Sequence, residues 1–427
     1  MSHLVVAADD ARLEALWAGL RAAGGLAVAR LLQSALTSED ESRGAAAAAS
    51  HACWEKLHTG DWKDVALAWR DAYSLAALLQ LSCDASQGGA PADAHASLRA
   101  LDIAALVGGP AFRDEVDQAI ERAQAALDAP RPPKRQRGDA DEPLPPLGDA
   151  PEGGAPQLPP GSGVGGIGRA ELPPLESFLT EQMAGAGTPL LVTGLVGTWP
   201  AAQRWRDPAY LLRVAGARTV PVEVGRHYLA DGWRQELMPL SRFLEEHLRS
   251  GGDSAEGRAY LAQHALFEQV PALRGDIVTP DYCSLGGGEL RAVNAWLGPA
   301  GTVTPLHHDP HHNVLAQVVG AKYVRLYAPH QSPALYAHPS GHCTNSSQVD
   351  VAAPDHDAFP LFAAAPFVDV ELRAGEVRQD VLALCFCIIA DKHAPGAVHP
   401  AGVVALRAGA HLLLLRLLLV GLSLVVT

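Results

Sequence analysis

The 427-residue sequence has few cysteines and no recognisable cysteine pattern. None of the six belongs to a CxxC pair or a dense framework: Cys53, Cys83, Cys283, Cys343, Cys385 and Cys387. The start MSHLVVAADDARLEAL also lacks a charged segment followed by a long apolar run. These absences argue against a disulfide scaffold and a secretory signal, and they favour a reducing, intracellular compartment.

Positive charge is also scarce. Thirty-three basic residues stand against 47 acidic ones, which gives a net charge of −14. This balance argues against adhesion to nucleic acid or to an anionic membrane as the main activity, and it favours a basic partner such as an Arg- or Lys-rich peptide. The last stretch, AHLLLLRLLLVGLSLVVT, is very apolar but short for a bilayer span, and it contains Arg416. A tail anchor is therefore not favoured.

The composition divides the chain into regions of different kind. Residues 1–128 are rich in Ala and Leu at helical spacing and predict an α-helical domain of several antiparallel helices, without a clean repeat period. Residues 129–174 are rich in Pro, Gly and charge and predict a disordered linker. Its basic cluster RPPKRQR (131–137) fits a nuclear-import signal and fits equally a solvated charged linker. From residue 175, short β-branched segments between turn residues predict a sandwich or barrel with a few helices.

The stretch TPLHHDPHHN concentrates four histidines around one aspartate. His307 and Asp309 are two residues apart, so on a strand their side chains lie on one face. One imidazole and one carboxylate are two thirds of the triad that holds non-haem Fe(II). Chance alone supplies roughly one His-x-Asp in such a composition, so the pair needs support from its neighbours. Pro310 predicts that the pair lies at a strand end, with His311 and His312 in the turn.

The segment AKYVRLY supplies that support. As a strand it places Lys322, Val324 and Leu326 on one face. A lysine on an inward, aliphatic face needs an anion, because a buried ammonium without a partner is costly. A co-substrate carboxylate would be such an anion, whereas an edge-strand lysine would instead reach water.

Several segments together resemble the Jumonji-C (JmjC) family of Fe(II)/2-oxoglutarate oxygenases, and within it the lysine-specific demethylase 8 or Jumonji domain-containing protein 5 type. They are NAWLGPAGTVTPLHHDPHHNVLAQVVGAKYVRLY, TNSSQVDV, FPLF and AAPFVDVELRAGEV, with YLAQHALFEQVPALRGDIVTPDYCSLG upstream. The resemblance runs from about residue 175 to Val377 and, more faintly, over residues 51–81. It implies an α+β multidomain protein in which the helical domain precedes a double-stranded β-helix, the cupin-like jelly roll, at 175–377.

The resemblance also implies roles for particular residues. It implies His307 and Asp309 as iron ligands and as the catalytic pair. It implies that the 2-oxoglutarate site is formed by Tyr260, Trp296, Thr304, Asn313 and Lys322. In PVEVGRHYLADGW it implies that Glu223 and Trp233 hold an arginine side chain, which is consistent with a carboxylate that pairs with guanidinium and an indole that stacks on it.

The sequence departs from the family after Val377. Residues 378–427 form an atypical apolar tail, and the position expected for the third iron ligand, a histidine, is Phe386. Two interpretations compete: a misread or alternatively spliced exon, or a genuine tail in which His393 or His399 substitutes. We favour the first, because the loss of the family pattern is confined to one boundary. In either case we expect an incomplete C-terminal end of the jelly roll, with an unpaired edge and weakened iron binding.

The resemblance implies a dioxygenase that uses Fe(II) and 2-oxoglutarate to hydroxylate an arginyl residue of a basic protein, with histone-lysine demethylation as the related activity. We expect a nuclear protein, also found in the cytoplasm, that acts on chromatin, for example on a histone tail. The alternative is a catalytically impaired JmjC protein that binds basic peptides. A cupin-like isomerase would need further metal ligands in place of Lys322.

Overall fold

The computed structural model describes residues 10–37, 42–60, 62–86, 93–128, 147, 167–184, 189–248, 258–287, 290–309, 313–380, 385–390 and 402–406. The chain separates into two compact units, one of residues 1–141 and 217–219, the other of 142–216 and 220–427. In the described part of the chain, no helix combines the length and the apolar composition that crossing a membrane requires. The basic cluster 131–137 and the apolar end 407–427 lie outside the described residues.

The first unit is helical, as the periodicity predicts. Its helices are α1 Ala11–Ala22, α2 Leu26–Thr37, α3 Ser42–Leu57, α4 Leu67–Ser86, α5 Ala94–Val107 and α6 Arg113–Asp128. Their apolar stripes meet in one core, where Leu20, Leu32 and Phe112 are fully buried. The Asp10 side chain caps α1 by accepting the Arg12 backbone N–H at 2.9 Å, because the first turn of a helix has no internal partners for its N–H groups.

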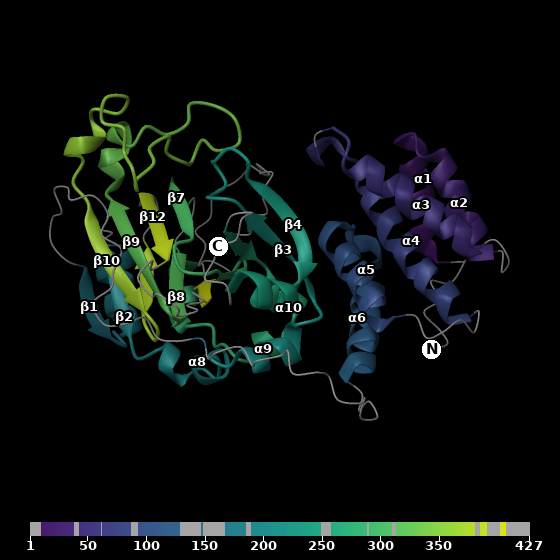
Figure 1. Ribbon diagram of the computed structural model, residues 1–427, viewed down its shortest axis with the longest axis horizontal. Coiled ribbons are helices and arrows are strands. Elements are labelled where there is room, and N and C mark those ends of the chain that lie inside the picture. Colours follow the sequence, from purple (N-terminus) through teal and green to yellow (C-terminus); the bar gives the residue numbers. More distant parts are fainter. Residues whose placement is uncertain are drawn as a thin grey trace. The chain divides into compact units, whose positions relative to one another are not determined.

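The second unit is built from two sheets (Figure 1). The larger sheet has the order β1-β2-β11-β8-β13-β6-β5-β3-β4, and the smaller has the order β10-β9-β12-β7. The strands are β1 Gly168–Glu171, β2 Leu190–Thr193, β3 Thr219–Val224, β4 Arg234–Pro239, β5 Ala259–His264, β6 Val293–Leu297, β7 Val303–His308, β8 Asn313–Val319, β9 Ala321–Tyr327, β10 Val368–Arg373, β11 Val377–Asp380, β12 Cys385–Ala390 and β13 Gly402–Leu406. The short helices are α7 Leu175–Ser177, α8 Ala201–Arg204, α9 Pro208–Ala215, α10 Leu240–Arg242, α11 Leu266–Gln269 and α12 Pro271–Arg274.

The two sheets pack face to face through an aliphatic layer. Leu315 of the larger sheet contacts a cluster that includes Val324, Leu326 and Leu372 of the smaller one, all of them buried. Alternation along each strand puts these side chains on the inner faces. The expected two-sheet jelly-roll architecture is therefore confirmed.

The C-terminal end of the jelly roll differs from our expectation. The strand β12 pairs with both β9 and β7, and β13 pairs with both β8 and β6, so the chain after Val377 fills positions inside both sheets. The expected incomplete end with an unpaired edge is wrong in this respect. The physical reason is that sheet pairing uses backbone N–H and C=O groups. The apolar, β-branched residues of this segment suit a strand even though they do not match the family.

The predicted linker 129–174 is also ordered in part. The strand β1 pairs in parallel with β2, and Leu147 is buried and donates its backbone N–H to the Arg206 carbonyl at 2.7 Å. Composition misses such contacts because an edge strand and a single inserted leucine need little apolar sequence around them.

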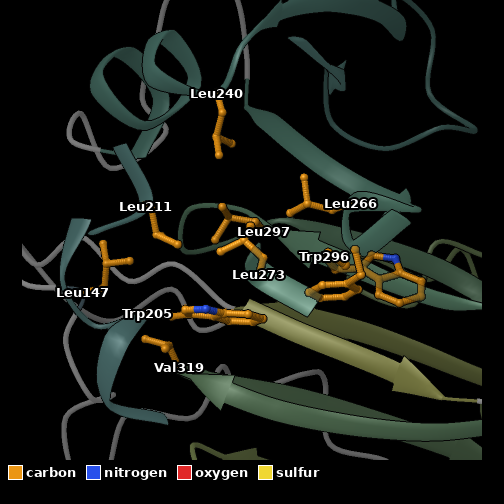
Figure 2. Close-up of a pocket in the computed structure, with 11 residues that line it drawn as sticks. Leu147, Trp205, Leu211, Leu240, Leu266, Leu273, Trp296, Leu297 and Val319 are labelled. Carbon is orange, nitrogen blue, oxygen red and sulfur yellow. The ribbon is translucent and has the colours of Figure 1, made fainter. Parts of the chain in front are cut away.

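An apolar pocket adjoins Leu147 (Figure 2). Its lining is aliphatic and aromatic throughout: Leu147, Trp205, Leu211, Leu240, Leu266, Phe267, Leu273, Ala295, Trp296, Leu297 and Val319. A pocket without a titratable lining group has no means of moving protons or holding a metal ion. The chemistry predicted from the sequence therefore belongs elsewhere, at the end of β7.

Candidate functional site

The predicted iron pair lies where the smaller sheet ends. The strand β7 stops at His308, and Asp309 follows it directly, as the proline at 310 predicts, although residues 310–312 lie outside the described residues. His307 Nε2 lies 3.9 Å from Asp309 Oδ1. One ion bound by both atoms at roughly 2.0–2.2 Å would draw them closer, because adjacent ligands of an octahedral ion lie roughly 3 Å apart. Asp309 is 8% exposed, so a cation beside it would be largely shielded from water.

Neighbouring groups orient both side chains of the pair. The Nδ1 atom of His307 lies 2.8 Å from the Pro305 carbonyl oxygen. Because a carbonyl only accepts, Nδ1 carries the proton, and Nε2 keeps its lone pair on the side of Asp309. Asn313 donates from Nδ2 to Asp309 Oδ2 at 3.2 Å. This is the supporting shell that a metal-binding imidazole and carboxylate require.

A third protein ligand is not found in the described part of the chain. No group of three His, Cys, Asp or Glu residues suited to a metal ion is present there. In the register of β12 against β7, the residue paired with His307 is Phe386, and phenylalanine has no donor atom. His393 and His399 lie outside the described residues. The pair thus fits two positions of a metal ion, and the structure leaves the third predicted position without a described ligand.

Lys322 lies on the inner face of β9, as its parity predicts. It is 1% exposed, and its Nζ donates to the Tyr260 hydroxyl at 2.8 Å. Among the described residues, no carboxylate lies within ion-pair distance of this ammonium. Burial lowers the pKa of Lys322 to about 7. The site therefore lacks an anion, and a dicarboxylate co-substrate would supply one.

The other residues predicted for the co-substrate come from both sheets: Thr304 from β7 of the smaller sheet, and Tyr260, Trp296 and Asn313 from β5, β6 and β8 of the larger one. A Thr304 side-chain hydrogen bond reaches Tyr260, whose pKa is raised chiefly by burial. Asn313 Oδ1 is buried without a hydrogen-bond partner, and a buried acceptor left open in this way marks room for a donor. Trp296 packs, partly buried, against the aliphatic layer between the sheets. The structure thus brings the lysine, the phenol and the threonine together.

The two residues predicted to hold arginine also meet. Glu223 lies in β3 opposite Tyr260 of β5, and Trp233 Nε1 donates to Glu223 Oε2 at 3.3 Å. A Cβ at Gly225 (φ +134°) would lie 3.2 Å from Trp233 Cα, so only glycine lets the two ends of this connection approach. Burial raises the pKa of Glu223 to about 7, against the lowering effect of the tryptophan N–H. A cation is the natural partner for this carboxyl group.

Sequence reasoning missed Tyr228 and Ser346. The Tyr228 hydroxyl lies 2.9 Å from Ser346 Oγ, and Ser346 pairs through its backbone with His307. Both lie in segments that carry the family resemblance, PVEVGRHYLADGW and TNSSQVDV, but these segments are far apart in sequence and neither residue was given a role. Only the folded chain reveals that the connection carrying Trp233 touches the segment beside the predicted metal ligand.

Two families match this chain. Residues 175–377 match the family described as a cupin-like domain, and residues 6–137 match the one described as KDM8-like, N-terminal ARM repeats. The second match corrects our expectation that the helical domain lacks a repeat. Helical repeats of this kind are units of about 40–47 residues defined by packing, so their sequence period is easily missed.

Curated proteins of several organisms are similar over most of their length. The chain is 39% identical over 383 residues to lysine-specific demethylase JMJ30 of Arabidopsis thaliana, which covers 86% of this chain and 87% of that protein. It is 37% identical over 328 residues to lysine-specific demethylase 8 of Danio rerio, with 76% and 79% covered. It is 35% identical over 337 residues to Jumonji C domain-containing protein 5 of Drosophila melanogaster, with 76% and 78% covered.

Proposed function

Because this chain belongs to the JmjC family of Fe(II)/2-oxoglutarate-dependent oxygenases, in its lysine-specific demethylase 8 type, we propose that it hydroxylates arginyl side chains of basic proteins. That it is a protein-modifying oxygenase follows from the family. The choice of arginine is the proposal, and one observation carries it. A carboxyl group and an indole, Glu223 and Trp233, lie within 3.3 Å of each other in the same fold as the metal pair.

Each residue of the site has a task in this proposal. His307 and Asp309 would hold the iron, which when bound supplies the activation of oxygen at the expense of 2-oxoglutarate, with succinate and CO2 as products. Lys322 binds the distal carboxylate of the co-substrate through a charge-assisted hydrogen bond, and Tyr260 and Thr304 complete that end. These contacts fix the co-substrate beside the iron.

The protein side of the reaction is binding and exclusion of water. The Glu223 carboxylate takes the guanidinium in a fork, and the Trp233 ring offers a face for stacking. The aliphatic layer beneath Trp296 keeps water out of the barrel interior. A lysine-like cation can also bind a carboxylate, and hydroxylation of an N-methyl group would lead to demethylation, the activity in the names of the relatives.

A non-catalytic peptide binder explains the site less well. In such a protein no bound anion would pair with the fully buried Lys322, so this lysine would only lower the stability of the fold. The partner we propose is an arginine-containing basic protein, for example a histone tail, because the chain itself carries a net charge of −14. We further propose that the protein acts in the nucleus, with the basic cluster 131–137 as the import signal.

The test is a turnover assay with two matched peptides. One contains a single unmodified arginine and the other a dimethyl-lysine at the same place, each incubated with Fe(II) and 2-oxoglutarate. We expect peptide-dependent succinate and the gain of one oxygen atom on the arginine peptide, both lost in Glu223→Gln. If formaldehyde forms from the lysine peptide and the arginine peptide gains no oxygen, the activity is lysine demethylation and the proposed arginyl hydroxylation is wrong. Absence of succinate at every iron concentration would favour the binder.

A further inference from the structure

The connection between β3 and β4 carries more than Trp233. Residues 225–233 turn back through hydrogen bonds from the Ala230 N–H to the His227 carbonyl (2.9 Å) and from the Trp233 N–H to the Ala230 carbonyl (3.2 Å). Tyr228 lies between these ends. Its hydroxyl is within 2.9 Å of Ser346 Oγ, and either oxygen can be the donor. The Tyr228 side chain thus reaches beyond residues 225–233, and its hydroxyl group is held by Ser346.

The segment that holds Tyr228 is itself tied to the end of β7. Ser346 pairs with His307 in an isolated antiparallel bridge. On either side, Ser347 donates its N–H to the Leu306 carbonyl at 2.8 Å, and His308 donates its N–H to the Asn345 carbonyl at 2.9 Å. Ser346 is 2% exposed. Its hydroxyl is therefore a rigid anchor, set beside the predicted metal ligand.

The phenol of Tyr228 lies in the field of both carboxyl groups of the site. Burial is the largest cause that raises its pKa, and Glu223 and Asp309 each add to the rise. The phenol therefore stays neutral and keeps its hydroxyl proton. A neutral phenol that donates to Ser346 still has a lone pair for an incoming N–H.

We propose that Tyr228, fixed by Ser346, is a positioning residue that sets how deeply the target side chain enters between Glu223 and the His307–Asp309 pair. This inference rests on the proposed function, because the side chain it positions is the arginine. The hydroxyl oxygen accepts one guanidinium N–H while Glu223 accepts two others in a fork, so the guanidinium is held from two directions. A cation held at two points presents the same carbon to the metal in each turnover. The site is therefore expected to select for side-chain length, because a side chain that is one methylene longer places a different carbon beside the metal.

The experiment compares arginine and homoarginine peptides of otherwise identical sequence. Wild type is expected to favour arginine in KM by at least roughly 5-fold, the scale of one hydrogen bond. Tyr228→Phe and Ser346→Ala should raise the KM for the arginine peptide roughly 3–10-fold. Both variants should also narrow the preference over homoarginine to below about 2-fold, since the depth stop is gone. The KM for 2-oxoglutarate should not change, and Ser346→Thr, which keeps a hydroxyl, should restore the preference.

A second readout does not depend on turnover. Binding of the labelled arginine peptide to protein loaded with Mn(II) and 2-oxoglutarate, measured by fluorescence anisotropy, should weaken by the same factor in Tyr228→Phe. The matched control is Tyr282→Phe, whose lost hydroxyl donates to the Pro173 carbonyl at 2.7 Å. It should leave both peptide preference and peptide affinity at the wild-type value.

The possible failures are distinguishable. Wild type that neither oxidises nor binds the arginine peptide overturns the proposed function, and this inference with it. Wild type that acts on arginine, with Tyr228→Phe and Ser346→Ala retaining the wild-type KM and preference, overturns the inference alone. If Tyr228→Phe does not fold, Ser346→Ala decides, because it removes the anchor and leaves the tyrosine in place.

Discussion

Replacement of Lys322 by methionine separates two effects of this residue: the cost of burying its charge, and the binding of the co-substrate carboxylate. Burial lowers its pKa from 10.5 to about 7, which corresponds to a stability cost of roughly 5 kcal/mol when the ammonium is charged. Methionine has a similar length and no charge, so it fits the same inner face of β9. We therefore expect Lys322→Met to be more stable than wild type in the absence of ligand, by roughly 1–4 kcal/mol once local relaxation is allowed for.

The pH dependence of this gain has a definite sign. The folded pKa of Lys322 is lower than its unfolded value, so between about 7 and 10.5 the unfolded chain binds the extra proton. The stability of wild type should rise with pH across this window. The advantage of Lys322→Met should be largest at and below pH 7 and fade toward pH 10.5.

When the co-substrate is bound, wild type should be the more stable of the two proteins. With Mn(II) present and 2-oxoglutarate at 100 times its Kd, wild type should gain about 2.7 kcal/mol, and Lys322→Met should gain almost nothing. Thermal unfolding followed by circular dichroism measures both effects, at about 2–4 °C for each kcal/mol in a unit of this size. The control is Lys56→Met, which removes an exposed lysine of α3 and should change neither quantity. The reasoning is refuted if Lys322→Met is less stable than wild type without ligand, or if 2-oxoglutarate still stabilises it in full.

Three further changes test other parts of the site. The affinity for an arginine peptide should rise with pH up to about 7, where the Glu223 carboxyl group ionises, and the affinity of Glu223→Gln should not depend on pH in this range. Because the pKa of Glu223 is raised, the stability that this group contributes is present below its unfolded pKa near 4.5 and is lost as the pH rises through about 7. Asp309→Asn should weaken Mn(II) binding, followed by electron paramagnetic resonance, by more than the roughly 10–100-fold that loss of an outer-shell partner costs; an unchanged affinity would exclude Asp309 as a ligand. Leu372→Ala, at a fully buried position between the sheets, should cost roughly 2–5 kcal/mol in urea unfolding, and a loss below about 1 kcal/mol would show that the layer is loosely packed.

The sequence predicted much of this fold because the decisive signals are local. Helical periodicity located the first unit, and strand parity in AKYVRLY put Lys322 on the inner, aliphatic face of β9. The demand of a buried lysine for an anion needed no structure, because it follows from the cost of desolvating a charge. The His-x-Asp pair and its place at a strand end were also readable, since alternation and proline act within a few residues.

Other features depended on contacts between distant segments. Composition predicted a linker where β1 pairs with β2, and the unfamiliar tail predicted an open edge where β12 and β13 fill the sheets. Both errors have one cause. Which strands pair is decided by contacts between segments far apart in sequence, so it cannot be read from the residues of either segment alone.

The sequence by itself thus determined the residue types that can do the chemistry: an imidazole and a carboxylate at strand spacing, an inward lysine, and a glutamate close in sequence to a tryptophan. Only the tertiary structure decided that Tyr228 meets Ser346 beside His307, and that Phe386 is the residue paired with that histidine. The physical reason is range. Parity and desolvation act on a residue and its neighbours in the chain, whereas a site is made where strands far apart in sequence are brought into register by the packing of two sheets.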